Sequence, residues 1–444
     1  MPSKTTIIMN NLIGIRHEDK YVMERRVPLT PLHIKNLINN LHLSFNVQSS
    51  PKRIFSDKEF ELAGAKIVND LADCPTIFGV KEMPLSFFEM EKTYMFFSHV
   101  IKGQSYNRPM LKKMMEMKCN LIDYERVVND SGQRLIFFGR FAGLAGMINS
   151  LWSLGQRLKY FGISTPFERI QQSHKYHSLE EARHVISGVG QEIAENGLPA
   201  GLAPMVIGFT GYGNVSNGAQ EIAALLPLKE INANELTSLK ERKNLPGNVI
   251  YKVIFKEKHI VEPIESNDQF ELLDYYQYPE KYKSQFEQYI PHLTVLMNCM
   301  YWDDRYPKIV TKDYLRKLYS SGEPRIKVLG DITCDPDGSI ECTHKEGTEI
   351  EDPVFVYNPF NGETTMGFEG DGILDMAVDI LPSELPRESS IAFGDVLWKY
   401  VKGIATADYD RPFEELNLPG PIKKALILHK GELTPDFKYI KEYL

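Results

Sequence analysis

The chain has 444 residues, of which 43% are hydrophobic and 25% are charged, and its formal net charge at pH 7 is −8. This length exceeds what a single core usually organises, so two domains are expected. The composition is that of a globular protein without repeats, and its acidic balance argues against nucleic-acid binding, which needs a positive surface.

The N-terminal segment contains no cleavable apolar core, and no apolar run approaches the length that crosses a bilayer. We therefore expect no membrane contact and a cytoplasmic location. The cysteines are scattered without a Cys-x-x-Cys pair, which is typical of reduced structural thiols. No group of side chains has the spacing of a metal site, so no metal is expected.

The first third of the chain alternates between short apolar segments and helical patterns. Strands are predicted within residues 5–15, 76–82, 94–100 and 120–125, and helices over 31–41, capped by Thr30, and over 107–118. Such alternation is typical of a parallel sheet with helices on its faces, so this part should form a domain of its own.

The second domain is predicted to span residues 145–385. Small and apolar residues over 139–162 predict a long, closely packed helix that bridges the two domains. Residues 235–292 are polar and aromatic, and they are expected to form an insertion that is solvated or contacts another subunit. A predicted helix over 386–405 leads back to the first domain, which would then contain residues 1–144 and 386–444.

A glycine-rich turn, GYGNVSNGA, occupies residues 211–219 between a predicted strand and a predicted helix. This context is typical of a dinucleotide-binding fingerprint, although serine stands at the third glycine position. Glycines let the backbone approach the pyrophosphate, and a helix N-terminus offers free N–H groups. The expected binding residues of the turn are Gly211, Gly213, Asn214, Val215 and Ser216.

Coenzyme choice depends on the strand that follows this helix. An acidic side chain about twenty residues beyond the first glycine normally binds the ribose 2′-hydroxyl of NAD. Asn232 stands near that place if the strand is LKEI, and an amide does not repel a 2′-phosphate, so NADPH is favoured over NAD. A register shift of one or two residues would put Glu230 there and reverse the preference.

Charged side chains of the first domain follow the predicted strands, at the edge where open α/β sheets bind ligands. They are Arg16, Glu18, Glu24, Arg25, Arg26, Lys81, Glu82, His99, Lys102, Asp123 and Glu125. Arginine binds carboxylates, lysine polarises a carbonyl and histidine exchanges protons near neutral pH, so this set suits amine and keto-acid chemistry. For any single residue, a solvated rim of charges is the alternative.

Several segments resemble one family: GVKEMP, YMFFSHVIKGQ, LIDYERV, FGRFAGLAGMI, TGYGNVSNGAQEI, LGDITCDPDGSIE and LPSELPRESSIAFGDVLWKYV. Almost end to end, the chain resembles the lysine:2-oxoglutarate reductase part of bifunctional aminoadipate-semialdehyde synthase. More distantly, it resembles fungal lysine-forming saccharopine dehydrogenases and alanine dehydrogenase. The resemblance implies two Rossmann-like, doubly wound α/β domains flanking a cleft and joined by long helices. It also implies that L-lysine condenses with 2-oxoglutarate and that NADPH reduces the imine to saccharopine.

The resemblance implies roles for particular residues. Lys81 and His99 would be the acid/base pair, and Glu125 would adjust it and hold the Lys81 ammonium. Carboxylates would be bound by Arg26 and Arg134. The remaining implied positions are Glu24, Lys102 and Arg16 lining the pocket, Asp335 facing substrate and nicotinamide, and Asn298, Asp379, Ile380 and Leu381 on the nicotinamide side.

Two other functions stay open. One is an alanine-dehydrogenase-like amination of another keto acid, and the other is a catalytically silent NADP-binding sensor or partner subunit. The chain ends about where the bifunctional protein continues, so we expect a free-standing reductase and a separate saccharopine dehydrogenase in the pathway. A homo-oligomer is compatible with the sequence, which does not determine the oligomeric state.

Overall fold

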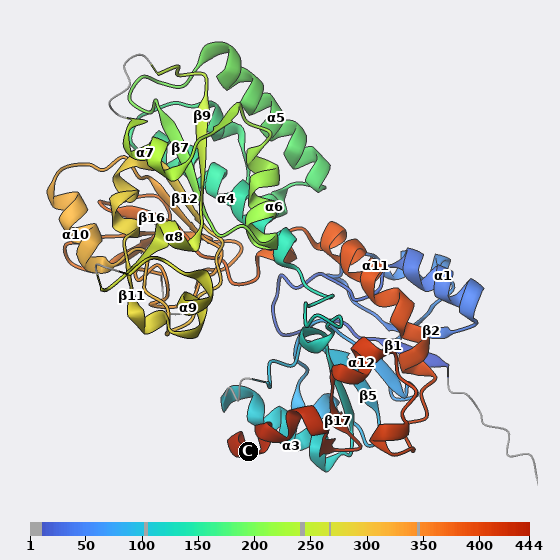
Figure 1. Ribbon diagram of the computed structural model, residues 1–444. Coiled ribbons are helices and arrows are strands. Elements are labelled where there is room, and N and C mark those ends of the chain that lie inside the picture. Colours follow the sequence, from blue (N-terminus) through green and yellow to red (C-terminus); the bar gives the residue numbers. More distant parts are fainter. Residues whose placement is uncertain (1–10, 102–104, 240–244, 266–267, 344–346) are drawn as a thin grey trace, which may run out of the picture. The chain divides into compact units, whose positions relative to one another are not determined.

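The structure is a computed structural model that describes residues 11–101, 105–239, 245–265, 268–343 and 347–444 (Figure 1). The chain divides into two compact units, of which the first contains Met1–Phe138 and Pro386–Leu444 and the second contains Gly139–Leu385. The second unit thus begins at Gly139, whereas the sequence placed this boundary at residue 145. None of the helices within the described ranges is long and apolar enough to span a bilayer.

The first unit is built on an eight-stranded sheet in the order β18-β17-β6-β5-β4-β1-β2-β3. Its parallel strands are β1 (Leu12–Ile15), β2 (Ser44–Gln48), β3 (Lys66–Val68), β4 (Thr76–Phe78), β5 (Thr93–Phe96) and β6 (Asn120–Asp123). The antiparallel strands β17 (Leu426–His429) and β18 (Glu432–Leu433) extend it at one edge. Because β17 pairs with β6, the C-terminal tail completes this sheet, which the predicted purely parallel arrangement did not include.

Helices cover this sheet, partly where the hydrophobic periodicity predicted them. They are α1 (Pro31–Leu41), α2 (Asp57–Leu62), α3 (Arg108–Glu116), α11 (Pro386–Ala405) and α12 (Gly420–Lys424). Figure 1 shows α1 beside α11, and Leu37 of α1 and Leu397 of α11 belong to one buried cluster. The predicted helices over 31–41 and 386–405 are confirmed at these bounds, with Thr30 as the N-cap of α1.

The second unit contains another eight-stranded sheet, in the order β15-β14-β16-β13-β12-β7-β9-β8. The strands are β7 (Met205–Thr210), β8 (Leu228–Glu230), β9 (Ile250–Phe255), β12 (Val295–Asn298), β13 (Val328–Asp331), β14 (Val354–Tyr357), β15 (Thr364–Met366) and β16 (Ile373–Met376). All pairings are parallel except those of β14 and β15. The strand beside β7 is β9, and β8 lies beyond it at the edge. Residues 250–255, expected in the insertion, therefore form a strand inside the main sheet.

The remaining elements of the second unit are α4 (Gly139–Tyr160), α5 (Leu179–Asn196), α6 (Asn214–Ala223), α7 (Ala233–Thr237), α8 (Glu257–Ile260), α9 (Leu272–Gln277), α10 (Lys312–Ser320) and the antiparallel pair β10 (Val261–Pro263) and β11 (Tyr282–Ser284). Helix α4 is closely packed against α6, as its small residues predicted. A Cβ atom built on Gly143 would lie 1.9 Å from the carbonyl oxygen of Val215, and one on Gly218 would lie 2.1 Å from that of Arg140. Two glycines thus let the backbones of these helices approach each other.

Candidate active site

In the first unit, the candidate residues follow β1, β4, β5 and β6, which are neighbours in the sheet. Because the strands are parallel, their carboxyl ends lie at one edge, the usual place for ligands in such sheets. Hydrogen bonds and an ion pair link the segment after β1 to the end of β4, and Glu82 there contacts His99 after β5. One candidate, Lys102, lies outside the described residues.

Lys81 follows β4, and interactions of its backbone N–H and its ammonium group link it to the segment after β1. The buried carboxylate of Glu18 accepts hydrogen bonds from the backbone N–H groups of Val80 at 2.7 Å and Lys81 at 2.9 Å. The Lys81 Nζ lies 5.5 Å from the centre of the Tyr21 ring. Its positive charge also contributes to lowering the pKa of Glu24, which places Lys81 in the electrostatic reach of that carboxylate. The segment after β1 therefore forms the surroundings of Lys81.

Glu18 itself has an unusual acidity. Burial, reinforced by the negative charge of Glu24, raises its pKa from 4.5 to about 7. Hydrogen bonds from the two backbone N–H groups favour the ionised form but do not offset burial. A carboxyl group that exchanges its proton near neutral pH thus lies beside Lys81, at a position for which the sequence suggested no role beyond the rim of charges.

His99 follows β5 and is oriented by a glutamate from the end of β4. Its ring Nδ1 lies 2.7 Å from Glu82 Oε1, and the same carboxylate oxygen is 2.8 Å from Lys20 Nζ. Although burial opposes ionisation, His99 and Lys20 together lower the pKa of Glu82 to about 2. Glu82 is therefore an anion at any working pH, and it fixes the orientation of the histidine ring.

The backbone at His99 adopts a conformation that is rare for residues other than glycine. Its φ is 50°, in the left-handed region, which costs of order 1–3 kcal/mol for a residue other than glycine. The Asn107 side-chain amide donates to the carbonyl oxygens of Ser98 at 3.0 Å and His99 at 3.4 Å. Surrounding contacts thus hold a strained residue in place, as is common at functional sites.

Glu125 follows β6 and forms an ion pair with Arg134. Its backbone N–H donates to Asp123 Oδ1 at 2.7 Å, and its carboxylate is 3.5 Å from Arg134 Nη1. Burial raises the pKa of Asp123, and the Glu125 charge raises it further, whereas His99 opposes the shift. Glu125 thus pairs with Arg134, another candidate residue, and the charges of both Glu125 and His99 act on Asp123.

Arg16 and Arg26, which follow β1, are buried and form ion pairs with acidic groups. Arg26 donates from Nε at 2.8 Å and from Nη2 at 2.6 Å to the two carboxylate oxygens of Glu24. Its guanidinium lies over the Phe138 ring, 4.2 Å from the centre. Arg16 is 2.5 Å from Asp19 and 4.6 Å from the Phe87 ring centre. Glu24 thus binds two nitrogens of Arg26 and fixes the orientation of its guanidinium group.

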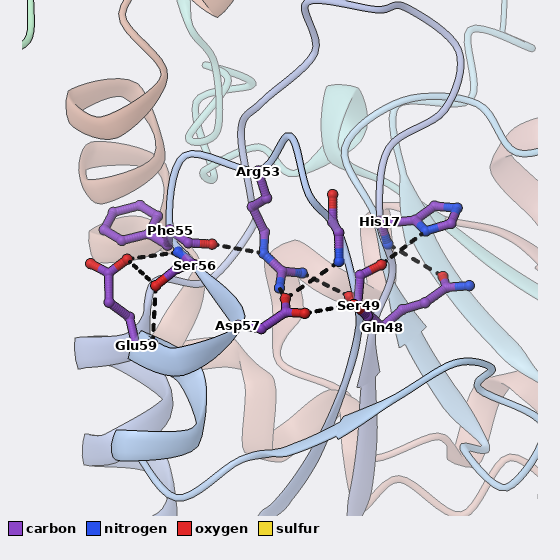
Figure 2. Close-up of polar contacts among 9 residues, drawn as sticks. His17, Gln48, Ser49, Arg53, Phe55, Ser56, Asp57 and Glu59 are labelled. Atoms are coloured by element: carbon purple, nitrogen blue, oxygen red, sulfur yellow. Dashed lines mark hydrogen bonds and ion pairs between the residues drawn. The ribbon is translucent and has the colours of Figure 1, made fainter.

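Figure 2 shows how the neighbouring loop supports this segment. Arg53 donates to the carbonyl oxygen of Gln48 at 2.9 Å and pairs with Asp57, which also accepts from Ser49 Oγ at 2.6 Å. On the other side, the His17 N–H donates to Gln48 Oε1 at 3.4 Å, and its ring Nδ1 lies 3.3 Å from the Ser49 carbonyl oxygen. The loop after β2 therefore fastens the start of the segment that carries the candidate arginines.

In the second unit, the glycine turn joins β7 to α6. Gly211 has φ 76°, and its N–H donates to the carbonyl oxygen of Phe255 at 3.1 Å, so the turn lies against the end of β9. Gly213 is the N-cap of α6, whose first residues are Asn214, Val215 and Ser216. Ser216 is fully buried and accepts a hydrogen bond from Gln220 at 3.0 Å. Serine at the third position thus packs as the usual glycine would.

A pocket of about 380 Å³ opens beside this turn. Its lining comes from the ends of β7, β9 and β12 and from the segments after β9 and β12: Gly211, Tyr212, Gly213, Phe255, Glu257, Ile260, Tyr275, Tyr276, Cys299, Met300, Tyr301 and Tyr306. The Glu257 carboxylate accepts from the hydroxyl groups of Tyr276 at 2.7 Å and Tyr212 at 3.2 Å. Residues expected in an insertion thus supply aromatic walls for a flat ring system.

A second hollow, of about 670 Å³, lies across Tyr212 from this pocket. It is lined by Tyr212, Glu230, Ile231, Asn232, Ala233, Glu235, Ile254, Lys256 and His259. Asn232 caps α7 by accepting the N–H of Glu235 at 2.9 Å. Both residues between which the sequence left the coenzyme preference open, Asn232 and Glu230, therefore border one hollow.

The other candidates of the second unit follow β12, β13 and β16. The Asn298 side chain is buried, with Oδ1 accepting from Thr210 at 2.9 Å and Nδ2 donating to Asp331 at 2.8 Å. This amide therefore organises the interior, and the next residues, Cys299 and Met300, face the pocket.

Asp335 is half-buried in the turn after β13, where its carbonyl oxygen accepts the Gly338 N–H at 2.9 Å. Asp379 is exposed, and after burial itself its charge is the largest cause that raises the pKa of the Cys334 thiol. Ile380 is half-buried and Leu381 is buried. The ends of β13 and β16 therefore bring Asp379 close to the segment that contains Asp335.

Comparison with known proteins first defines the fold class. Residues 14–145 match the family described as alanine dehydrogenase/PNT, N-terminal domain. The chain is similar to a solved L-alanine dehydrogenase with a TM-score of 0.62 at 16% identity, covering 98% of this chain and 100% of that one. A transhydrogenase from Sinorhizobium meliloti gives 0.56 at 14% identity, covering 95% and 100%. The predicted α/β fold with two Rossmann-like domains is confirmed.

Comparison with curated proteins finds relatives of higher sequence identity. The chain is 40% identical, over 97% of its length, to alpha-aminoadipic semialdehyde synthase of Arabidopsis thaliana, of which it covers 41%. It is 35% identical, again over 97%, to the mitochondrial alpha-aminoadipic semialdehyde synthase of Bos taurus, of which it covers 48%. A saccharopine dehydrogenase (NAD(+), L-lysine-forming) of Neurospora crassa is 26% identical over 86% of this chain and is covered to 88%. The predicted resemblance is confirmed, and the chain spans less than half the length of the two synthases.

Proposed function

We propose that this chain is an oxidoreductase that condenses L-lysine with 2-oxoglutarate and reduces the imine with NADPH to saccharopine. The observation that carries the proposal is the 40% identity to an alpha-aminoadipic semialdehyde synthase over 97% of the chain. In the reaction, the ε-amine adds to the keto carbon and water leaves, forming a carbon–nitrogen double bond. A hydride then adds to the carbon and a proton to the nitrogen.

The acid/base work falls to His99 and Lys81. Glu82 accepts from His99 Nδ1 at 2.7 Å and so leaves Nε2 to exchange a proton with the amine and the departing water. The Lys81 ammonium polarises the keto oxygen, and the Glu24 carboxylate in its electrostatic reach favours that charged form. Glu125 contributes its negative charge, which also raises the pKa of Asp123.

Saccharopine carries three carboxylates, which suits a site edge rich in cations. Arg16, Arg26 and Arg134 are the arginines at this edge, and Lys20 adds an ammonium beside Glu82. Because Glu24 already holds two nitrogens of Arg26, we propose that Arg26 binds a carboxylate with its remaining nitrogen.

The second unit has residues that fit a nicotinamide dinucleotide. Gly213 has no atom within 4 Å of a built Cβ, which leaves room for a pyrophosphate over the N-terminus of α6. The aromatic pocket beside the turn fits an adenine ring. Bound NADPH supplies the hydride. The proposal assigns Asp335, Asp379 and the backbone at Ile380 and Leu381 to the nicotinamide side.

A steady-state assay tests the proposal. Oxidation of NADPH should require lysine and 2-oxoglutarate together, and omission of either should abolish it. A chain that oxidises NADPH only with ammonia and pyruvate would instead be an alanine-dehydrogenase-like enzyme, the alternative that the L-alanine dehydrogenase fold favours. A chain that binds NADPH without turnover with any amine would be a sensor or a partner subunit.

We also propose that a separate saccharopine dehydrogenase consumes the product and that the chain acts in the cytoplasm as a homo-oligomer. The bovine relative is mitochondrial by name, so fractionation of source cells tests the location. The mass of the native protein in solution tests the oligomeric state.

A further inference from the structure

The strand order determines which residues lie beside the adenosine ribose and so select the coenzyme. These residues belong to a segment that the spacing from the glycine turn does not indicate. In the usual dinucleotide fold, the second strand lies beside the first, and its carboxyl end reaches the adenosine ribose. Here β9 takes this place, because it pairs with β7 from Met205–Ile250 to Thr210–Phe255. The residue that follows its end is Lys256. The ribose side of the site therefore begins with a cation.

Two groups beside this strand end can donate hydrogen bonds to an anion. Lys256 and His259 both line the 670 Å³ hollow, and Lys256 Nζ lies 5.8 Å from the centre of the Tyr212 ring. The backbone N–H of Lys256 donates to His259 Nδ1 at 3.1 Å, so the neutral ring carries its hydrogen on Nε2. Lysine and histidine thus present an ammonium and an N–H to the same space.

The carboxylates around this hollow are engaged elsewhere. Glu230 is 2.7 Å from Lys252 Nζ, and Glu235 accepts the backbone N–H of Asn232 at 3.0 Å. Glu257, directly after Lys256, accepts from the hydroxyl groups of Tyr212 and Tyr276. A carboxylate that binds a ribose 2′-hydroxyl would have to leave one of these partners, whereas an incoming phosphate meets the Lys256 ammonium and the His259 N–H.

We infer that Lys256 and His259 form a subsite for a phosphate monoester on the 2′-carbon of the adenosine ribose. The inference rests on the proposed function and deepens it, because it names the residues that select NADPH over NADH. The adenine ring occupies the aromatic pocket, Tyr212 separates the two spaces, and the 2′-phosphate enters the hollow at the carboxyl ends of β8 and β9. Asn232 borders this subsite, in agreement with an uncharged residue at the end of β8.

Calorimetric binding of nucleotide fragments tests the subsite without catalysis. Adenosine 2′,5′-bisphosphate should bind the chain at least about tenfold more tightly than adenosine 5′-monophosphate, as charge-assisted hydrogen bonds provide. Lys256→Ala should remove most of this ratio and leave the affinity for the monophosphate unchanged. His259→Gln should reduce the ratio less, since it removes a neutral donor.

Lys258→Ala is the matched control, because Lys258 is an exposed neighbour on α8 that does not line the hollow. It should keep the wild-type ratio. Equal affinities of the wild type for the two fragments, or an equal loss with Lys258→Ala, would overturn the inference. If the ratio is absent while lysine and 2-oxoglutarate still drive coenzyme oxidation, the subsite fails and the reductase stands. If the ratio is present but lysine and 2-oxoglutarate do not drive coenzyme oxidation, the subsite stands and the proposed reductase function fails.

Discussion

The backbone N–H of Gly211 donates to the carbonyl oxygen of Phe255 at 3.1 Å. This hydrogen bond continues the pairing of β7 with β9 into the glycine turn, so the end of β9 is fixed beside the space where a pyrophosphate binds. The conformation of the turn and the position of Lys256 therefore depend on each other.

Substitutions at two glycines should distinguish the contribution of this turn to stability from its contribution to NADPH binding. Gly211→Ala should destabilise the chain by about 1–2 kcal/mol, because φ is 76° and a built Cβ lies 3.2 Å from Met300 Cα. Gly213→Ala meets no atom within 4 Å and should leave the melting temperature unchanged, yet its methyl group obstructs the phosphate and should weaken NADPH binding. Thermal unfolding and calorimetry measure the two effects. Equal stability losses would contradict this division.

Gly143 should be required for the packing of α4 against α6. Gly143→Ala raises helix propensity but places its Cβ 1.9 Å from the Val215 carbonyl oxygen, so we expect a loss of about 1–3 kcal/mol in the free energy of unfolding. Gly188→Ala on α5 is the control, because no atom lies within 4 Å of its Cβ. It should gain about 0.5–1 kcal/mol in chemical denaturation. An unchanged free energy of unfolding in Gly143→Ala would contradict the requirement for glycine between these helices.

His99 should be essential for turnover and dispensable for coenzyme binding. His99→Gln keeps a polar side chain but cannot exchange protons, so we expect kcat to fall by about 10²-fold or more while the Kd for NADPH stays the same. His177→Gln, an exposed histidine of the second unit, should match the wild type in both measurements. An unchanged kcat in His99→Gln would remove this residue from the mechanism.

Glu18 should make the stability depend on pH. Its pKa is raised from 4.5 to about 7 in the folded state, so folding holds the proton more tightly than the unfolded chain does. The resulting stability is complete below pH 4.5 and is lost as the pH rises toward 7. The unfolding free energy of the wild type relative to Glu18→Gln should therefore fall across this window in urea titrations. A difference that stays constant, or that increases with pH, would contradict the buried proton.

The sequence was sufficient for features that depend on local patterns. The helices over 31–41 and 386–405 have complete hydrophobic periodicity, and the glycine turn carries its own strand and helix signals. The charges after β1, β4, β5 and β6 were found because a buried strand ends where its polar residues begin.

Long-range pairing limited the prediction elsewhere. No local pattern shows that β9 inserts between β7 and β8, so Lys256 and His259 remained hidden in a segment that resembled an insertion. The contact of Glu82 with His99 joins two strands, and Lys20 reaches Glu82 from a loop. Glu82 stands next to Lys81 at the end of a predicted strand, and these two local signals place it at the site edge without indicating its partner.

Product analysis with isotopes tests the central claim most directly. The chain is incubated with lysine labelled at its ε-nitrogen, 2-oxoglutarate and NADPH deuterated at the hydride position, and the products are identified by mass spectrometry. The account predicts saccharopine that retains the labelled nitrogen and carries one deuterium on the carbon derived from the keto group. The absence of labelled saccharopine, together with deuterated alanine when pyruvate and ammonia replace lysine and 2-oxoglutarate, would contradict it.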